Sequence, residues 1–384
     1  MTTVPLTDVE DVELTLIARD VSDLLRAMLG PTGHPDAGSL IFPTLPIMGL
    51  VTEESFHYLS NAPQQSSLQP LPTLLFSRFG RAVTKTRARI KLFDDTDGGA
   101  DGLVEILELA HSKSVEWFRE PHRGPIRSLI RRFQPDLGIF FVGENLIAST
   151  HAVLPAMGIT LNELKDFSPK DLERLDERSF AFSREVGVYL GQLASFLHQL
   201  GKHVELQPEA PDIRDLRVSH NDFIGANVYQ LALDSFRPNE ARFVGAVIMA
   251  LAHINAALYV LPRLLRVKSN LLLRFQLLTA YHAGKTLEAS IPQILPPISD
   301  AERTVLRSRQ VRNLCAHFGL RGAAQTAMAA EDPFGAALQS LISVSRSEIE
   351  IVVNQWLRTV SDLLTARLSK SSLAPCRAWL GSHS

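Results

Sequence analysis

The chain has 384 residues, 45% of them hydrophobic and 21% charged, with a formal net charge of −2 at pH 7. It is long and apolar enough for two packed cores, which places it in the globular class. Its two cysteines, Cys315 and Cys376, exclude a disulfide framework, and neither stands in a zinc-ligand pair. Acidic residues replace the basic and apolar start of an export signal, so we expect a cytoplasmic protein.

The first half is predicted to be mostly helical with a few short strands. A helix is expected from Asp8 to Leu29, ending at Gly30-Pro31, and another from Phe182 to Leu200, closed by Gly201. The segment between Leu137 and Ala148 is the best strand candidate. Residues 34–72 lack a sustained period and are expected to be irregular, and 76–93 fit either helix or strand.

The second half is predicted to be a four-helix bundle. We expect an N-terminal domain over 1–210, a boundary region over 211–238 and the bundle over 239–384. The four expected helices are Asn239 to Leu261, Lys268 to Ser290, Ser299 to Phe318 and Ser343 to Leu368.

One apolar stretch, Phe243 to Leu261, has nearly the length of a membrane span. His253 and Asn255 interrupt it, and no second stretch of this kind is present. Such a helix also occurs at the centre of a soluble bundle, so we expect no membrane partner. His253 and Asn255 are interpreted as a hydrogen-bonded core pair rather than as ligands.

Basic and acidic residues are unevenly distributed along the chain. The segment from Leu258 to Arg321 has ten basic and three acidic residues, a sum of +7, which leaves −9 for the rest of the chain. A basic block suits a surface that binds a polyanion, because neutralised phosphates release counterions. Solvated helix faces are the alternative. The residues expected to contact RNA are Arg266, Lys268, Arg274, Lys285 and Arg309.

The third expected helix carries a motif, Arg312-Asn313-Leu314-Cys315-Ala316-His317. Ser299 and Glu302 form a capping-box pattern at its start, and Gly319 follows its end. On one continuous helix, Arg309, Asn313 and His317 would share a face, and Arg312 would lie about 140° from His317.

These residue types suit cleavage of RNA through its own 2′-hydroxyl. Histidine titrates near neutral pH and can move protons, and arginine can hold the charge of the phosphate oxygens with its planar fork. Asn313 is expected to hold the ring of His317 in one tautomer. This chemistry requires no metal or other cofactor.

The motif resembles that of the HEPN superfamily, whose ribonucleases carry Arg, often a polar residue, and then His on a helix of a four-helix bundle. The match is Arg312, Asn313 and His317, and the resemblance covers about the last 145 residues. It implies RNA as substrate, a homodimer with the motif helices facing each other, and roles in toxin, anti-phage or RNA-processing systems. An antitoxin or another defence protein is therefore an expected partner.

Other interpretations remain open at this point. Arg214 to His220 also fits the loose Arg-to-His pattern, but it lies outside any long helical period. Arg312 and His317 could instead be a surface cation and a polar helix cap. The whole bundle could be an inactive HEPN-like module that binds RNA or a nucleotide, or a helical protein-interaction domain.

Weaker features are interpreted structurally. Asp94 to Asp101 lacks ligands of a calcium loop and is expected to be a turn. Tyr281-His282 and the Lys285/Glu288 pair are interpreted as a solvated helix face, although they could line an RNA cleft.

Overall fold

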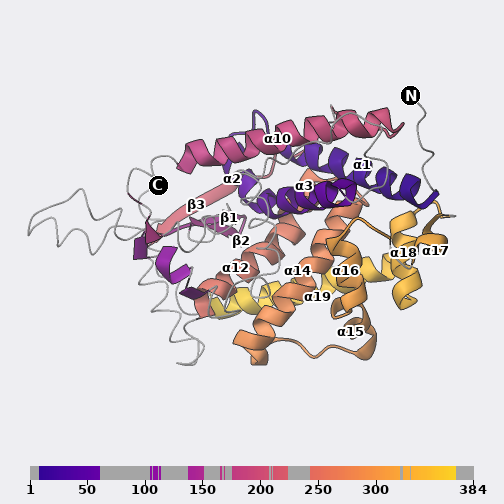
Figure 1. The fold of residues 1–384 in the computed structure, drawn as a ribbon. Coiled ribbons are helices and arrows are strands. Elements are labelled where there is room, and N and C mark those ends of the chain that lie inside the picture. Colours follow the sequence, from indigo (N-terminus) through magenta and orange to yellow (C-terminus); the bar gives the residue numbers. More distant parts are fainter. Residues whose placement is uncertain are drawn as a thin grey trace, which may run out of the picture.

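The structure is a computed structural model of the chain that describes residues 8–60, 137–150, 175–206, 211–223, 243–320 and 330–368, with short stretches within 104–113, 165–168 and 323–328. The described part is mainly helical with one small sheet, as the sequence predicts. Figure 1 shows α1, α3 and α10 above the helices of the second half. The expected helix or strand over 76–93 and the expected turn over 94–101 lie outside the described residues.

The upper layer consists of α1 (Asp8–Leu29), α3 (Leu45–Ser60) and α10 (Leu175–Gln199), with the short α2 (Ala37–Ile41) and a 3₁₀ turn (Phe42–Thr44) between α1 and α3. Helix α1 has the predicted bounds. Helix α10 ends where expected, and Gly201 after it has φ +74°, a conformation that favours glycine. Most of α3 is buried, so the prediction of irregular structure over 34–72 was wrong for 45–60. Burial on several sides erases the one-sided apolar period on which that prediction relied.

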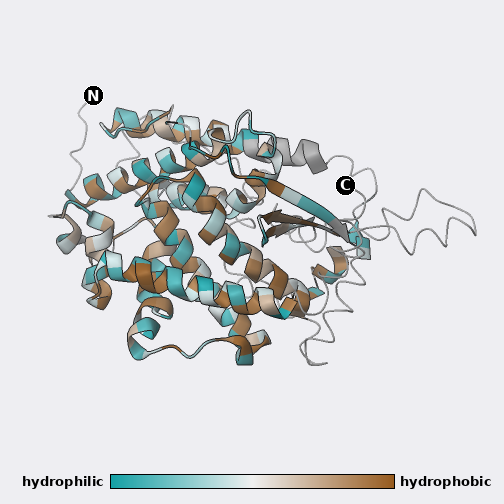
Figure 2. Cartoon of the chain, turned by 180° about the vertical axis from the view of Figure 1, so that it is seen from behind, coloured by the Kyte–Doolittle hydropathy of each residue, from teal (hydrophilic) through white to brown (hydrophobic). Residues whose placement is uncertain are grey.

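The sheet has three antiparallel strands in the order β2-β1-β3. β1 (Leu137–Val142) and β2 (Asn145–Ser149) form a hairpin where one strand was predicted, with Gly143 in the turn at φ +60°. β3 (Val218–Phe223) pairs along β1 from Leu137↔Phe223 to Val142↔Val218. Figure 2 shows the hairpin as largely hydrophobic and β3 as more hydrophilic. Part of the expected boundary region therefore belongs to the sheet.

The second half contains helical structure in all four expected places. The first helix is α12 (Val244–Asn255), continued by a π-helical segment η6 (Ala256–Val260) and α13 (Leu261–Leu264). The second is α14 (Asn270–Ser290), followed by a 3₁₀ turn (Pro292–Ile294), and the last is α19 (Arg346–Leu368). The third is divided into α15 (Asp300–Leu306) and α16 (Arg309–Ala316), and α17 (Ala324–Met328) and α18 (Pro333–Ile342) precede α19.

The third helix is divided where Arg307 contacts α14. The predicted capping box of Ser299 and Glu302 starts α15. At Arg307 the chain turns, and the guanidinium donates to the backbone oxygen of Ala280 at 3.1 Å and contacts Glu288 at 3.1 Å. A Cβ on Gly284 would overlap this guanidinium. Ser308 then caps α16 by accepting from the backbone N–H of Val311. The prediction of one helix over Ser299 to Phe318 was therefore wrong.

The apolar first helix passes through the centre of the protein. Among the described helices, Val244–Leu264 is the one that is long and apolar enough to cross a membrane, and 78% of its most apolar 18 residues is buried inside the protein. Buried Asn255 donates to the backbone oxygen of Leu146 at 2.8 Å and accepts from Ser361 at 2.6 Å. Asn255 is thus a hydrogen-bonded core residue, as its position in the stretch predicts.

The two halves of the chain share one continuous buried core, to which α1, α3, α10, α12, α14 and α19 all contribute. Polar contacts also cross from one half to the other. Ser269, the cap of α14, donates to Asp23 of α1 at 2.5 Å, and the backbone N–H of Leu320 donates to Glu13 at 2.5 Å. The described parts of the regions 1–210 and 239–384 therefore pack as one body.

Candidate functional site

The motif residues lie on α16 and directly after it. The helix ends at Ala316, and His317 is extended, with φ −133° and ψ 154°. His317 therefore does not stack above Arg309 and Asn313 on one helical face, which corrects the geometry expected from the spacing. The imidazole projects from the first residue beyond the helix instead.

Arg274 of α14 fixes this helix end from behind. Its Nη1 donates to the backbone oxygens of Leu314 at 2.7 Å and His317 at 3.0 Å. Its Nε lies 3.2 Å from the carboxylate of Asp20 on α1. Arg274 is only 1% exposed, so the prediction that it contacts RNA is wrong for this conformation. A cation at the C-terminal carbonyls of a helix complements the helix dipole, and the role of Arg274 is to cap α16.

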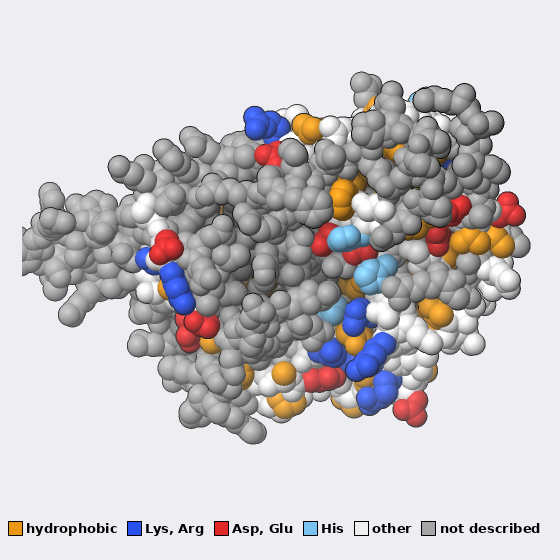
Figure 3. Space-filling view, viewed as in Figure 1, with side chains coloured by type: hydrophobic (Ala, Val, Ile, Leu, Met, Phe, Trp, Pro, Cys, Tyr) orange, Lys and Arg blue, Asp and Glu red, His pale blue; other side chains and the backbone are white. Residues whose placement is uncertain are grey.

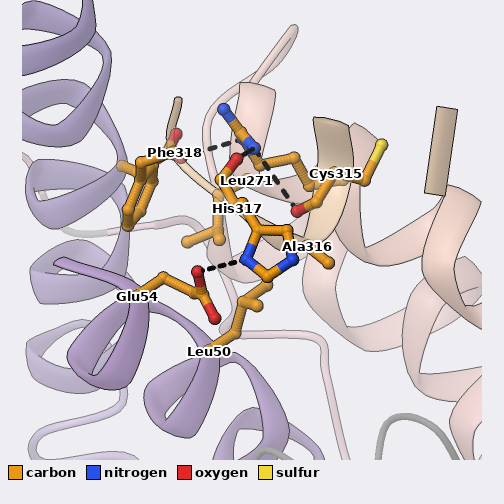
Figure 4. Close-up of a pocket in the computed structure, with 9 residues that line it drawn as sticks. Leu50, Glu54, Leu271, Cys315, Ala316, His317 and Phe318 are labelled. Atoms are coloured by element: carbon orange, nitrogen blue, oxygen red, sulfur yellow. Dashed lines mark hydrogen bonds and ion pairs between the residues drawn. The ribbon is translucent and has the colours of Figure 1, made fainter. Parts of the chain in front are cut away.

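The imidazole of His317 is bound to a carboxylate from the other half of the chain. Nδ1 of His317 lies 2.7 Å from Oε2 of Glu54 on α3. The Glu54 side chain is 7% exposed and that of His317 is 36% exposed. Figure 4 shows Glu54 reaching up to the ring, while the second ring nitrogen points away from it. The partner that orients the ring is therefore Glu54 and not Asn313, whose expected role is corrected.

This contact selects one tautomer. A carboxylate accepts a hydrogen bond and so holds a proton on Nδ1, which leaves Nε2 with its lone pair when the ring is neutral. Within the part of the chain that the structure describes, the contacts of the ring are those to Glu54 and the narrow pocket around it. A half-exposed imidazole with a buried carboxylate behind it can take a proton from a molecule in solvent.

Basic side chains gather around Tyr281 on the neighbouring helix. The guanidinium of Arg312 lies 5.7 Å from the centroid of the Tyr281 ring, and Nζ of Lys285 lies 5.4 Å from it. Arg303 and Arg309 are exposed on α15 and α16. Figure 3 shows lysine and arginine side chains grouped below histidines and carboxylates on this side of the molecule. We call Lys285, Arg303, Arg309 and Arg312 the basic face.

The structure does not join Arg312 directly to His317. Among the described residues, the interaction of the Arg312 guanidinium is the one with Tyr281, and its Nε is buried without a hydrogen-bond partner. A guanidinium has five N–H donors, so Arg312 has further donors besides the buried Nε that a bound phosphate could use. Arg312 is half-buried, with its guanidinium next to Tyr281 of α14.

Much of the basic block pairs with acids of the same chain. Arg263 contacts Asp215 at 2.5 Å, and Arg266 pairs with Glu205 and lies 3.7 Å from Asp23. Arg307 contacts Glu288. These pairs account for part of the asymmetry that suggested a polyanion surface, because Arg263 and Arg266 contact acids that precede the basic block and Arg307 contacts an acid within it. The prediction that Arg266 contacts RNA is weakened because its guanidinium is already paired.

Lys268 lies in a separate groove. Its backbone is in the left-handed region, with φ 63°, in the turn before α14. The groove contains the cations Arg19, Arg266, Lys268 and Arg346 and the acids Asp23, Glu331, Asp332 and Glu350. Four charges of each sign make it electrically mixed rather than basic. Lys268 is exposed, but it is not part of the basic face.

The rival motif has no helical arrangement. Arg214 lies in a turn and pairs with Asp212 at 3.1 Å, and His220 is exposed in β3. The ring of His220 packs against Phe140 of the neighbouring strand.

Tyr281 and His282 of α14 are buried, so the prediction of a solvated face was wrong for them. Cys315 is also buried, which raises the pKa of its thiol to about 12 and makes it a poor nucleophile.

Asp20, the partner of Arg274, makes stability sensitive to pH. Desolvation raises the pKa of Asp20 to about 7 although the Arg274 cation opposes the shift. A carboxyl with a raised folded-state pKa stabilises the fold most below its unfolded value of 3.8, and this contribution is lost as the pH rises to about 7. We expect the free energy of unfolding of the wild type to fall, relative to that of Asp20→Asn, between pH 4 and 7. Parallel urea-unfolding curves for the two proteins over this range would contradict the prediction.

Comparison with protein-family models, with curated proteins and with solved structures found no match to this chain. The case for a function therefore depends on the residues and geometry described above.

Proposed function

We propose that this protein is a metal-independent endoribonuclease that cleaves RNA through the 2′-hydroxyl next to the broken bond. The observation that carries the proposal is the hydrogen bond between His317 and buried Glu54, which leaves Nε2 of a partly exposed imidazole directly after α16, the helix that carries Arg309 and Arg312 of the basic face. The alternative, a surface cation and a polar helix cap, does not require a buried carboxylate behind the ring. The resemblance of the Arg312 to His317 motif to HEPN ribonucleases adds support.

In the proposed reaction, Nε2 of His317 takes the proton of the 2′-hydroxyl. The 2′-oxygen attacks the adjacent phosphorus, and the bond from phosphorus to the 5′-oxygen breaks. Glu54 stabilises the imidazolium that forms, because its carboxylate faces Nδ1–H. Arg312 and Lys285 hold the negative charge of the non-bridging oxygens, which is greatest in the transition state. The products are a 2′,3′-cyclic phosphate and a 5′-hydroxyl.

A substrate series tests this chemistry. We expect the purified protein to cut a single-stranded RNA and to leave a 2′,3′-cyclic phosphate, with no effect of EDTA. A substrate with one 2′-deoxy nucleotide at the cleavage position should bind with similar affinity, because its phosphates are intact, and should resist cutting at that position. Gel analysis of end-labelled RNA measures both rates. Equal cutting of the deoxy substrate, or inhibition by EDTA, would show that the proposed mechanism is wrong.

Binding is tested separately from cleavage. If the basic face contacts phosphates, log Kd should rise linearly with log salt concentration, and Lys285→Gln should reduce the slope. Lys268→Gln is the matched control, since Lys268 lies in the mixed groove. RNA that binds without being cut by any preparation would leave an RNA-binding module as the function.

A further inference from the structure

Helix α3 carries a histidine, His57, that lies next to a buried carboxylate as His317 does. Nε2 of His57 lies 3.6 Å from Oε1 of Glu53, and the side chains are 59% and 7% exposed, respectively. Two successive glutamates of α3 therefore each contact a histidine, Glu53 with His57 and Glu54 with His317. Carboxylates are seldom buried without a partner or a function. This arrangement was missed by the sequence analysis because 34–72 was expected to be irregular.

Helical spacing places His57 on the side of α3 that faces His317. Leu50, Glu54 and His57 are separated by four and three residues, so they lie on one side of the helix. Leu50 and Glu54 both line the pocket around His317. His57 is thus about one turn beyond Glu54 on the same side of α3, and 59% of its side chain is exposed. Figure 3 shows histidines next to carboxylates above the basic side chains.

The proposed cleavage needs two proton transfers, but His317 supplies only one group. A base removes the proton of the 2′-hydroxyl, and an acid gives a proton to the departing 5′-oxygen. Arg312 cannot serve as the acid because a guanidinium does not lose its proton in proteins. His282 is 1% exposed and cannot reach a substrate in solvent. Among the described residues of α3, the helix that supplies Glu54, His57 is the exposed side chain that can supply this proton.

We propose that His57 is the general acid of the same site, an inference that rests on the proposed function. The imidazolium of His57 gives its proton to the 5′-oxygen as the bond from phosphorus to that oxygen breaks. His317 has taken one proton and His57 has given one, so the charges of the two rings exchange and the protons balance. Glu53 stabilises the charged form of His57 before the reaction, and Glu54 stabilises the charged form of His317 after it.

The test uses a leaving group that needs no acid. Wild type, His57→Gln, His317→Gln and the control His198→Gln are compared on two RNA substrates. One substrate is normal, and the other has sulfur in place of the 5′-bridging oxygen, which leaves as a thiolate without a proton. His198 is an exposed histidine near the end of α10 and serves as the matched control. Thermal unfolding of each variant checks that it is folded.

We expect His57→Gln to cut the normal substrate about 100-fold or more slowly than wild type, the usual contribution of general acid catalysis. On the sulfur substrate it should cut within a few-fold of wild type, while His317→Gln remains slow on both. His57→Gln at the wild-type rate on normal RNA, or equally slow on both substrates, would overturn the role of His57 alone. Wild type that cuts neither substrate would overturn the proposed function itself.

Discussion

His317→Gln is expected to lower the rate of RNA cleavage about 10²- to 10⁴-fold, the range that a positioned acid–base group contributes. Glutamine has a similar reach and can donate a hydrogen bond to Glu54, but it cannot take a proton. The thermal midpoint should therefore change little. The rate is measured in single-turnover assays on end-labelled RNA, with folding checked by circular dichroism.

Two further variants distinguish proton transfer from structural support. Glu54→Gln keeps the shape of the side chain next to His317 but removes its charge, so it should retain more activity than His317→Gln. His220→Gln changes an exposed histidine of β3 in the rival motif and should leave the rate unchanged. If His220→Gln and His317→Gln lose activity equally, the assignment of the site to the end of α16 is wrong.

Arg274→Met is expected to lower the free energy of unfolding by about 3–5 kcal/mol, the usual cost of removing one partner from a buried ion pair. Methionine fills part of the space, but the carbonyls of Leu314 and His317 lose their donor and Asp20 loses its cation. The guanidinium also stacks over Phe334 at 4.3 Å, a contact that a thioether only partly replaces. Urea unfolding at about pH 9, where Asp20 with its pKa of about 7 is ionised in the wild type, gives the value.

A matched control and a second substitution make this test specific. Arg309→Met replaces an exposed arginine of α16 and should change the free energy by no more than about 0.5 kcal/mol. The double variant Asp20→Asn/Arg274→Met should be more stable than Arg274→Met, because no buried carboxylate is left without its partner. Additive losses in the double variant would mean that Asp20 and Arg274 are not coupled.

The helix ends and caps that depend on residues nearby in the sequence were predicted correctly. The end of α1 at Gly30-Pro31, the end of α10 before Gly201 and the cap of α15 at Ser299 were all predicted, and all depend on residues within one or two turns. Helix α3 was missed, because burial on several sides leaves no polar stripe to mark its period. The break at Arg307 was missed as well, since the guanidinium contacts a helix some twenty residues earlier.

For the site, the sequence by itself determined the residue types and their order: an arginine, an asparagine and a histidine near the end of a capped helix. Only the tertiary structure decided what surrounds them. Glu54 is 263 positions from His317 in the chain, and Asp20 and Arg274 join helices α1 and α14. Spacing along a sequence carries information about neighbours on one helix, whereas a buried carboxylate acquires its partner only when distant helices pack. The same packing pairs much of the basic block with acids. The net charge counted along the sequence therefore overstated the exposed basic surface that a polyanion could contact.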